Sequence, residues 1–376
     1  MTSVPPLAGF TVAVTADRRR HELATLLERH GARVMLAPAI RIAPLADDEI
    51  LHAATVLCAG APIDIAVVTT GIGFRGWMEA ADGWGLGEAL RERLAAAHVV
   101  ARGPKARGAL RAAGLADAFH PASECSTECL EHLLSRGVDG RRVAIQLHGE
   151  PLPGFADALR DAGADVVEVP VYRWAPHEDG ATLRRLVELV TAGSVDAVAF
   201  TSAPAVTSLL DVARDTGHED AFVAALRGPV MAACVGPVTA GPLTRRGVAT
   251  AQPDRSRLGA LVRHVTAELP NRSRRLHING HDVELRGHAI VVDGVLRALP
   301  PASLAILRAL ADRPGRVYSR AELVASLPAA EAAEHAVEMA VTRLRAAVRE
   351  VKLVETVIKR GYRLMVEPPT EREQPA

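Results

Sequence analysis

Two segments of the chain place hydroxyl side chains and glycine where a buried strand would turn into a helix. They are Phe200-Thr201-Ser202 and Gly236-Pro237-Val238-Thr239. At the carboxyl end of a parallel strand, loops and helix N-termini present unpaired main-chain N–H groups, which suit a carboxylate or a phosphate without any lysine. The alternative is that Thr201, Ser202 and Thr239 only cap helices, as such residues usually do. Spacing alone leaves both interpretations open.

The segments that contain these turns belong to an internal repeat. A single one-residue change of offset over about eighty positions indicates duplication of one α/β unit rather than chance. The matches at an offset of 132 residues are Gly31-Ala32 with Gly163-Ala164, Pro38 with Pro170, Asp64 with Asp196 and Thr69 with Thr201; at 133 residues they are Gly103-Pro104 with Gly236-Pro237, Leu110 with Leu243 and Gly114 with Gly247.

Short apolar runs alternate with helical patterns around these motifs. We expect strands at residues 10–15, 33–36, 65–69 and 98–101, and helices at 21–30 and 86–97. Apolar strands without polar alternation are typical of a parallel sheet that is covered on both faces. The sequence therefore predicts an α/β fold with two parallel sheets, one per repeat, that face each other across a cleft.

A possible metal site also needs to be weighed. His120, Cys125, Cys129 and His132 fall within thirteen residues. Their spacing differs from the paired knuckles of structural zinc sites, so we expect helix-entry residues here and no metal. The four cysteines of the chain are too few for a disulfide framework.

Charge is unevenly distributed although it sums to zero over 376 residues. Residues 271–376 hold 17 Lys and Arg against 13 Asp and Glu, whereas residues 1–270 hold 27 against 31. A basic segment attached to an acidic body points weakly to a nucleic-acid module. No apolar run approaches the length of a membrane span and no signal peptide is evident, so we expect no membrane partner and a cytoplasmic protein.

Residues 7–266 resemble uroporphyrinogen-III synthase. The residues that carry the resemblance are Leu7-Ala8-Gly9-Phe10-Thr11-Val12, Gly31-Ala32 to Pro38, Phe200-Thr201-Ser202, Gly236-Pro237 with Thr239-Ala240, and Leu258. The resemblance implies two flavodoxin-like domains joined by a two-stranded connector. The first would be formed by residues 1–38 and 173–266, and the second by 39–172. That family closes hydroxymethylbilane into a macrocycle with inversion of its last ring and needs no cofactor.

The resemblance also assigns roles to particular residues. Tyr172 matches the tyrosine that is thought to assist the leaving hydroxyl, although a tyrosine at a strand end is more often a packing residue. The positions that hold substrate carboxylates in the family, largely through main-chain N–H groups, correspond to Thr201, Ser202, Gly236 and Thr239, with Thr69 at the matching turn of the first repeat. The implied ligand is a tetrapyrrole or another small polycarboxylate in the cleft.

Several positions depart from the family pattern. The turn of the first repeat reads Val68-Thr69-Thr70-Gly71, Val238 replaces one of two threonines, and Ala16 stands where an arginine is usual. These changes keep the shape of a tetrapyrrole site while altering its hydroxyls. We therefore expect a sensor derived from an enzyme, and the sequence leaves turnover undecided.

The chain after residue 275 shows a different pattern. Residues 267–275 are expected to form a linker, and 367–376 a disordered tail. Between them we expect three short strands, a helix at 302–311, a second helix capped by Ser319 with Glu322 at its third position, a helix at 332–348, and a hairpin at 354–366. This order is that of a winged helix-turn-helix.

Residues 276–366 resemble the OmpR/PhoB-type effector domain of response regulators. The matching residues are Pro314-Gly315-Arg316-Val317, Ser319-Arg320-Ala321-Glu322-Leu323, Ala336-Val337, Arg343-Leu344-Arg345, Glu355-Thr356-Val357 and Gly361-Tyr362-Arg363. The resemblance implies that the 332–348 helix enters the major groove of duplex DNA and that the hairpin tip reaches the minor groove. The expected DNA contacts are Thr342, Arg343, Arg345, Lys359 and Arg360.

The combination predicts a transcription regulator that binds promoter DNA, as a possible homodimer, with a synthase-like sensor in the place of a receiver domain. It resembles actinobacterial regulators of nitrate and nitrite assimilation. The alternative is a bifunctional, active uroporphyrinogen-III synthase that also binds DNA. A synthase with a structural appendage is the third possibility, and the retained arginines of the recognition helix speak against it.

Overall fold

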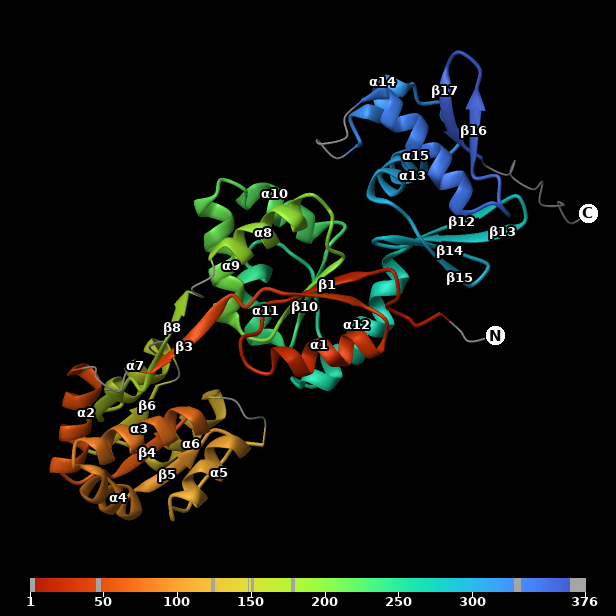
Figure 1. Cartoon of the computed structure of the whole chain (residues 1–376). Coiled ribbons are helices and arrows are strands. Elements are labelled where there is room, and N and C mark those ends of the chain that lie inside the picture. The colour runs from red at the N-terminus through yellow and green to blue at the C-terminus, as the bar shows by residue number, and fades with distance from the viewer. Residues whose placement is uncertain are drawn as a thin grey trace, which may run out of the picture. The chain divides into compact units, whose positions relative to one another are not determined.

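The computed structural model describes residues 4–44, 49–122, 126–147, 149, 152–176, 180–327 and 333–365 (Figure 1). The chain divides into two compact units. Unit 1 comprises residues 1–40 and 176–376, and unit 2 comprises 41–175. Unit 1 contains a first α/β domain and a C-terminal domain, and unit 2 is the second α/β domain. No helix in the described ranges is long and apolar enough to cross a membrane.

The first α/β domain is built on a five-stranded parallel sheet in the order β11-β10-β9-β1-β2. Its strands carry valines and alanines on both faces, so helices must cover both. α1 and α12 pack on one face through Leu23, Leu27 and Leu261, and Figure 1 shows α8, α9 and α10 on the other. The elements are β1 Thr11–Val14, α1 Arg20–Arg29, β2 Arg33–Leu36, α8 Gly180–Thr191, β9 Ala197–Phe200, α9 Ala203–Asp215, α10 Glu219–Arg227, β10 Met231–Cys234, α11 Pro237–Thr244, β11 Thr250–Ala251 and α12 Leu258–Glu268.

The second α/β domain has a four-stranded parallel sheet in the order β5-β4-β6-β7. Alternate residues of β4 face two separate cores: Ala66 and Val68 pack with α2 to α5, and Ile65 and Val67 pack with α6 and α7. The elements are α2 Glu49–Gly60, β4 Ile65–Val68, α3 Gly71–Gly83, α4 Gly87–Ala96, β5 His98–Ala101, α5 Pro104–Ala112, α6 Ser126–Arg136, β6 Arg142–Gln146, α7 Pro153–Asp161 and β7 Asp165–Val169.

The expectation of one sheet per repeat is wrong. β2 of the first repeat lies in the same sheet as β9 and β10 of the second, and β7 of the second lies with β4 and β5 of the first. Each repeat is therefore divided between the two sheets. The cause is the pair of connecting strands β3 (Ile40–Pro44) and β8 (Tyr172–Pro176), which form a two-stranded sheet. β3 leads the chain out of the first sheet after β2, and β8 returns it before α8.

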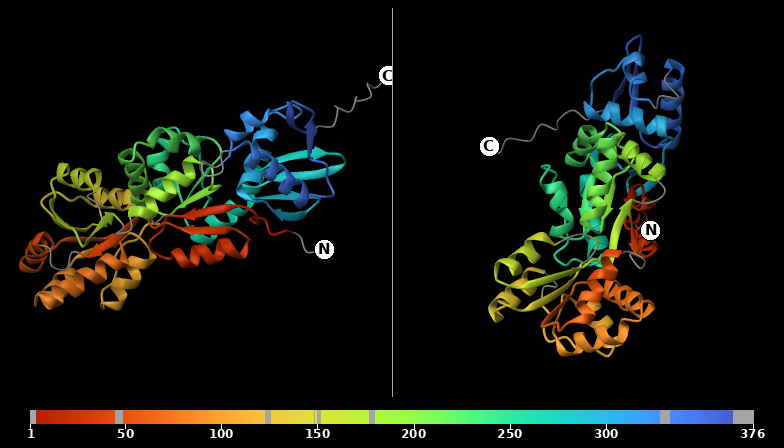
Figure 2. Two further views of the ribbon diagram at one scale, coloured as in Figure 1. Left: turned by 45° about the horizontal axis from the view of Figure 1, so that its top comes forward. Right: turned by 90° about the vertical axis from the view of Figure 1, so that its left-hand side faces the viewer.

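The C-terminal domain packs three helices against an antiparallel sheet of four strands and a closing hairpin. Figure 2 gives two further views of the chain. The fourth strand, β15, was not predicted from the sequence. Residues 267–275, expected to be a linker, are folded: they contain the end of α12, a 3-10 turn with the buried Leu269, and the start of β12. The elements are β12 Arg274–Ile278, β13 His281–Leu285, β14 Ala289–Val292, β15 Val295–Ala298, α13 Pro301–Asp312, α14 Arg320–Val324, α15 Glu334–Ala347, β16 Val354–Val357 and β17 Gly361–Leu364.

Within unit 1 the C-terminal domain is hydrogen-bonded to the first α/β domain. The guanidinium of Arg286 donates to the carbonyl of Ala8 at 2.7 Å, and Arg308 donates to the carbonyl of Gly193 at 3.3 Å. The main-chain N–H of His288 donates to the carbonyl of Gly9 at 2.8 Å. These contacts come from α13 and from the turn between β13 and β14. The expected tail, 367–376, lies outside the described residues.

Candidate functional site

The turn after β9 presents free main-chain donors. Ser202 is the N-cap of α9, and its hydroxyl accepts a hydrogen bond from the N–H of Ala205 at 3.4 Å. The main-chain N–H groups of Thr201 and Ser202 make no hydrogen bond within the described ranges of the chain. Both residues are half-buried. The capping role and the ligand-binding role, left open by the spacing, are therefore compatible for Ser202.

The turn after β10 brings Gly236 against a residue that the sequence analysis did not single out. A Cβ at Gly236 would collide with the hydroxyl of Ser256, so a larger residue here would require the Ser256 side chain to move. Thr239, a predicted ligand residue, is 5% exposed, whereas its neighbour Val238 is 78% exposed. Ser256 lies beyond the repeat motifs, and no spacing signal pointed to it.

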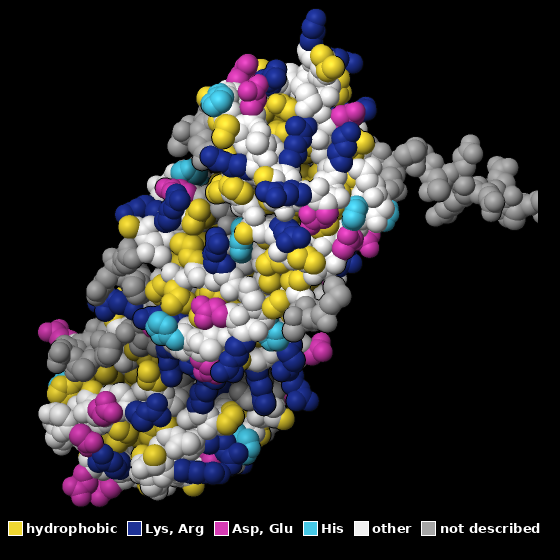
Figure 3. Space-filling model, turned by 45° about the vertical axis from the view of Figure 1, so that its right-hand side comes forward, with side chains coloured by type: hydrophobic (Ala, Val, Ile, Leu, Met, Phe, Trp, Pro, Cys, Tyr) yellow, Lys and Arg dark blue, Asp and Glu magenta, His cyan; other side chains and the backbone are white. Residues whose placement is uncertain are grey.

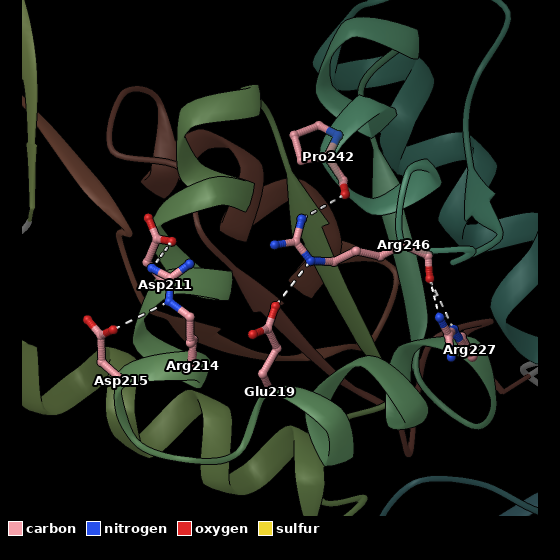
Figure 4. A network of polar contacts seen from close by, with 7 residues as sticks. All are labelled: Asp211, Arg214, Asp215, Glu219, Arg227, Pro242 and Arg246. Carbon is pink, nitrogen blue, oxygen red and sulfur yellow. Dashed lines mark hydrogen bonds and ion pairs between the residues drawn. The ribbon is translucent and has the colours of Figure 1, made fainter.

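A polar network holds the helix that follows this turn (Figure 4). Arg246 donates to Glu219 at 3.2 Å and to the carbonyl of Pro242 in α11 at 3.3 Å, and the Nε of Arg227 donates to the carbonyl of Arg246 at 3.1 Å. These bonds tie α10 and α11 together on the side of Pro242, the proline inside α11. The network fixes α11, whose first turn begins at the candidate site.

The turn after β4 is the counterpart in the second α/β domain, and a side chain occupies it. The Oε1 atom of Gln146 accepts hydrogen bonds from the N–H groups of Thr69 and Thr70, both at 3.1 Å. The hydroxyl of Thr69 donates to the carbonyl of Gln146 at 2.7 Å. Thr69 is 4% exposed and Gln146 is 0% exposed. The predicted ligand residue Thr69 is thus buried and already paired, and the sequence analysis missed Gln146.

Tyr172, the candidate catalytic residue, lies at the start of β8 and is 6% exposed. Its ring belongs to the core of the second α/β domain and stacks edge-on against Trp174, with 5.6 Å between ring centroids. The ring therefore packs in the core, and a role of the Tyr172 hydroxyl in catalysis stays a prediction.

The predicted DNA-binding residues of α15 differ in what they contact. Thr342 and Arg343 are exposed, and the Thr342 hydroxyl donates to the carbonyl of Glu338 at 2.8 Å. Arg345 is exposed as well, but its guanidinium is tied to the hairpin, where it donates to the carbonyl of Val354 at 3.0 Å and to the hydroxyl of Thr356 at 2.8 Å. Arg345 therefore braces the hairpin against the helix. Arg343 projects from α15 without an ion pair to any described residue.

The hairpin tip is exposed and basic. Lys359 adopts a left-handed backbone conformation with φ of 60°, and Arg360 follows it at the turn. Ile358 beside them is 83% exposed. Glu338 on α15 pairs with Arg320 at 2.8 Å, so this carboxylate is neutralised within the domain. Figure 3 shows Lys and Arg side chains over the C-terminal part of this face, with Asp and Glu among them.

The cluster weighed as a metal site does not assemble among the described residues. Cys129 is buried in the core, and the Nε2 of His132 lies 3.1 Å from the Nε2 of His98, with Phe119 stacked on His132. Burial and the nearby arginine Arg136 lower the pKa of both histidines. No group of three or more metal-binding side chains occurs in the described part of the chain, and Cys125 lies outside it.

Comparisons with known proteins identify the two parts of the chain. Residues 21–263 match the family model for uroporphyrinogen-III synthase HemD. The chain belongs to the uroporphyrinogen-III synthase family. Residues 296–364 match the model for the C-terminal domain of transcriptional regulatory proteins. The HemD-family body is thus fused to a DNA-binding domain, and the fusion supports a DNA-binding regulator.

Individual relatives match the body of this HemD-family chain. A crystal structure of a mutant uroporphyrinogen III synthase from the extremely thermophilic bacterium Thermus thermophilus is similar, with 32% identity, a TM-score of 0.57, and coverage of 70% of this chain and 99% of that one. An uncharacterized protein of Bacillus subtilis strain 168, YjjA, is 29% identical over 68% of this chain and 94% of its own length. A putative uroporphyrinogen-III synthase of Methanothermobacter thermautotrophicus is 29% identical over 34% of this chain and 49% of its own.

Proposed function

We propose that this HemD-family protein is a transcription regulator that binds promoter DNA through its C-terminal domain and senses a small anionic ligand through its α/β body. The observation that carries the proposal is the fusion of the two matched regions in one chain. We include in the proposal that the ligand is a tetrapyrrole or a related polycarboxylate, and that the regulated genes serve nitrate and nitrite assimilation. A homodimer on paired DNA sites belongs to the same proposal.

The DNA contacts follow from exposure and pairing. Arg343, Lys359 and Arg360 are exposed cations on the helix and hairpin that this domain type uses on DNA. Arg345 acts indirectly, because its guanidinium is bound to the hairpin strand through Val354 and Thr356. The ligand contacts are assigned to the turn of Thr201 and Ser202, whose N–H groups are available to a carboxylate.

Fluorescence anisotropy with a DNA fragment from upstream of the protein's own gene tests the DNA half of the proposal. Arg343→Ala should weaken binding by about tenfold, and Lys359→Ala should lower the slope of log affinity against log salt by about one. Arg111→Ala removes the same charge from an exposed site in the second α/β domain and serves as the control. Equal affinities of the Arg343 and Arg111 variants would overturn the assignment of α15.

The second candidate function is an active synthase that also binds DNA. The observation that favours this second function is the 32% identity to the Thermus enzyme over nearly the whole length of that enzyme. The test supplies hydroxymethylbilane and measures type III uroporphyrinogen above the type I isomer that forms spontaneously. A clear excess of type III would show turnover and replace the sensor by a bifunctional enzyme.

A further inference from the structure

The two α/β domains contain equivalent strand-to-helix turns. The main-chain N–H groups of the turn at Thr69 have an acceptor, and those of the turn at Thr201 have none among the described residues. In the register of the sheets, Ile65 of β4 pairs with Val143 of β6, and Ala197 of β9 pairs with Val12 of β1. The start of each strand pair makes the same bond: Asp64 accepts from the N–H of Arg142 at 2.8 Å, and Asp196 accepts from the N–H of Thr11 at 2.7 Å. Counting along the strands from these bonds shows that Gln146 of the second α/β domain occupies the position equivalent to Thr15 of the first.

The two side chains at this equivalent position do different things. The Thr15 hydroxyl donates to the carbonyl of Ala199 at 3.0 Å and stays on its own strand pair. Gln146 instead reaches across the end of its sheet, and its Oε1 accepts both N–H groups of the Thr69-Thr70 turn. One oxygen accepting two adjacent main-chain N–H groups is the arrangement that a ligand carboxylate adopts at such a turn.

The rest of the Gln146 amide is also satisfied inside the domain. Its Nε2 donates to the carbonyl of Leu147, and lies 3.4 Å from the hydroxyl of Thr70. A Cβ at Gly73 would collide with this Nε2 and would stand 2.7 Å from Cγ2 of Val171. Glycine at position 73 therefore makes room for the amide. The matching residue of the first domain, 132 positions on, is Ala205, which goes with the shorter Thr15.

We propose that the Gln146 side chain is a built-in substitute for a ligand carboxylate, which closes the anion position of the second α/β domain and confines the anionic ligand to the turn of Thr201 and Ser202. Gln146 then determines at which of the two equivalent turns a ligand carboxylate binds. The inference rests on the proposed ligand-sensing function for its biological meaning, but the closed anion position can be tested without that ligand.

All three tryptophans, Trp77, Trp84 and Trp174, lie in residues 41–175, so tryptophan fluorescence of the full chain reports unfolding of the second α/β domain alone. Gln146→Ala leaves the N–H groups of Thr69 and Thr70 without their acceptor, and should lower the urea midpoint. Inorganic phosphate should then bind these groups and raise the midpoint. At a phosphate concentration ten times its dissociation constant, the ratio of folded to unfolded domain should rise about tenfold.

Val143→Ala is the matched control, because it truncates a fully buried side chain on the same strand and leaves only an apolar cavity. Phosphate stabilises folded proteins generally, and this variant measures that effect. A midpoint shift of Gln146→Ala no larger than that of Val143→Ala, at equal ionic strength, would overturn the proposal. A larger shift that is specific to Gln146→Ala supports it.

The reciprocal experiment introduces a glutamine at the equivalent position of the first domain, so that its amide would occupy the N–H groups of the Thr201-Ser202 turn. Thr15→Gln together with Ala205→Gly should abolish binding of uroporphyrin III, measured by porphyrin fluorescence anisotropy, while Gln146→Ala should strengthen it. Retained binding in the double variant contradicts the assignment of the ligand to the first domain. Absence of uroporphyrin binding by the wild-type chain would count against the proposed tetrapyrrole ligand. The rise in the urea midpoint of Gln146→Ala with phosphate would still test whether Gln146 closes an anion position.

Discussion

The turn at Thr69 and the turn at Thr201 are copies of one motif, yet only the second has free donors. Both follow a buried inner strand of the sheet, β4 or β9, and both start a helix with a hydroxyl N-cap, Thr70 or Ser202. In the second α/β domain Gln146 accepts the turn's N–H groups, and in the first domain the described residues provide no acceptor. A duplicated backbone therefore keeps its shape while one side chain on a neighbouring strand decides whether the N–H groups of the turn already have an acceptor.

The largest expected effect concerns the space that the amide of Gln146 occupies. Gly73→Ala would drive a methyl group into the buried Nε2 of Gln146 and against Thr70 Oγ1, 2.8 Å away. Gln146 is fully buried and hydrogen-bonded through both Oε1 and Nε2, so displacing its amide would break these bonds. We expect the free energy of unfolding of the second domain, followed by tryptophan fluorescence in urea, to fall by about 3 kcal/mol.

Gly76→Ala in the same helix is the control for this change. A Cβ at Gly76 meets no atom within 4 Å, so the substitution should raise the stability by up to about 1 kcal/mol through helix propensity. Similar effects at positions 73 and 76 would mean that Gln146 does not need the glycine, and the contrast between the two turns would lose its steric basis.

The fold was predictable where a local pattern decides it. The α/β class with parallel sheets, the strands at 33–36 and 98–101, and the three helices with a hairpin after residue 300 all follow from apolar periodicity and glycine or proline stops. The division of each repeat between two sheets did not follow, because strand pairing at long range leaves no periodic trace. β15, with its residues Val295 and Leu296 more than a third exposed, carries too little apolar alternation to be recognised as a strand.

The site was predictable only in part, for a similar reason. The sequence singles out Thr201, Ser202 and Gly236 because hydroxyls and glycine mark turns, and the structure places them at such turns; their contact with a ligand stays a prediction. Gln146 gave no such signal. Its equivalent, Thr15, lies 131 residues earlier, one residue short of the 132-residue offset of the repeat, and a glutamine at a strand end belongs to no turn motif. The role of Arg345 was hidden as well, since its contacts with Val354 and Thr356 depend on how the hairpin returns to α15.

A second prediction uses the carboxylates that begin the two equivalent strand pairs. Asp64 is exposed, whereas Asp196 is covered in unit 1 by Gly287 and lies near Arg308 of α13. Burial raises the pKa of Asp196 from its ordinary value of 3.8 to about 6, against the opposing effects of the Thr11 N–H and Arg308. Because the pKa of Asp196 is higher in the folded state, its carboxyl stays protonated to a higher pH in the folded chain than in the unfolded chain. The stability of unit 1 should therefore fall as the pH rises from about 4 to about 6.

Asp196→Asn should remove this part of the pH dependence, which is on the order of 2 kcal/mol. The measurement is urea unfolding by circular dichroism at several pH values, taking the transition that tryptophan fluorescence does not report. Asp64→Asn removes the same hydrogen-bonded carboxylate at an exposed position and should leave the pH dependence of unit 1 unchanged. If Asp196→Asn kept the full slope, the contact with Gly287 and Arg308 would not bury the carboxylate in solution.

The smallest expected effect separates the two roles of the N-cap hydroxyls. The Thr70 hydroxyl accepts from Gly73 N–H at 3.2 Å and also faces the Gln146 amide, whereas the Ser202 hydroxyl accepts only the longer bond from Ala205 N–H. Thr70→Ala should cost about 1 kcal/mol in urea unfolding, and Ser202→Ala about 0.5 kcal/mol. Because Ser202→Ala hardly disturbs the fold, a loss of uroporphyrin III affinity in that variant can be assigned to the hydroxyl itself. Unchanged affinity would make Ser202 a cap alone and leave the main-chain N–H groups as the donors to the carboxylate.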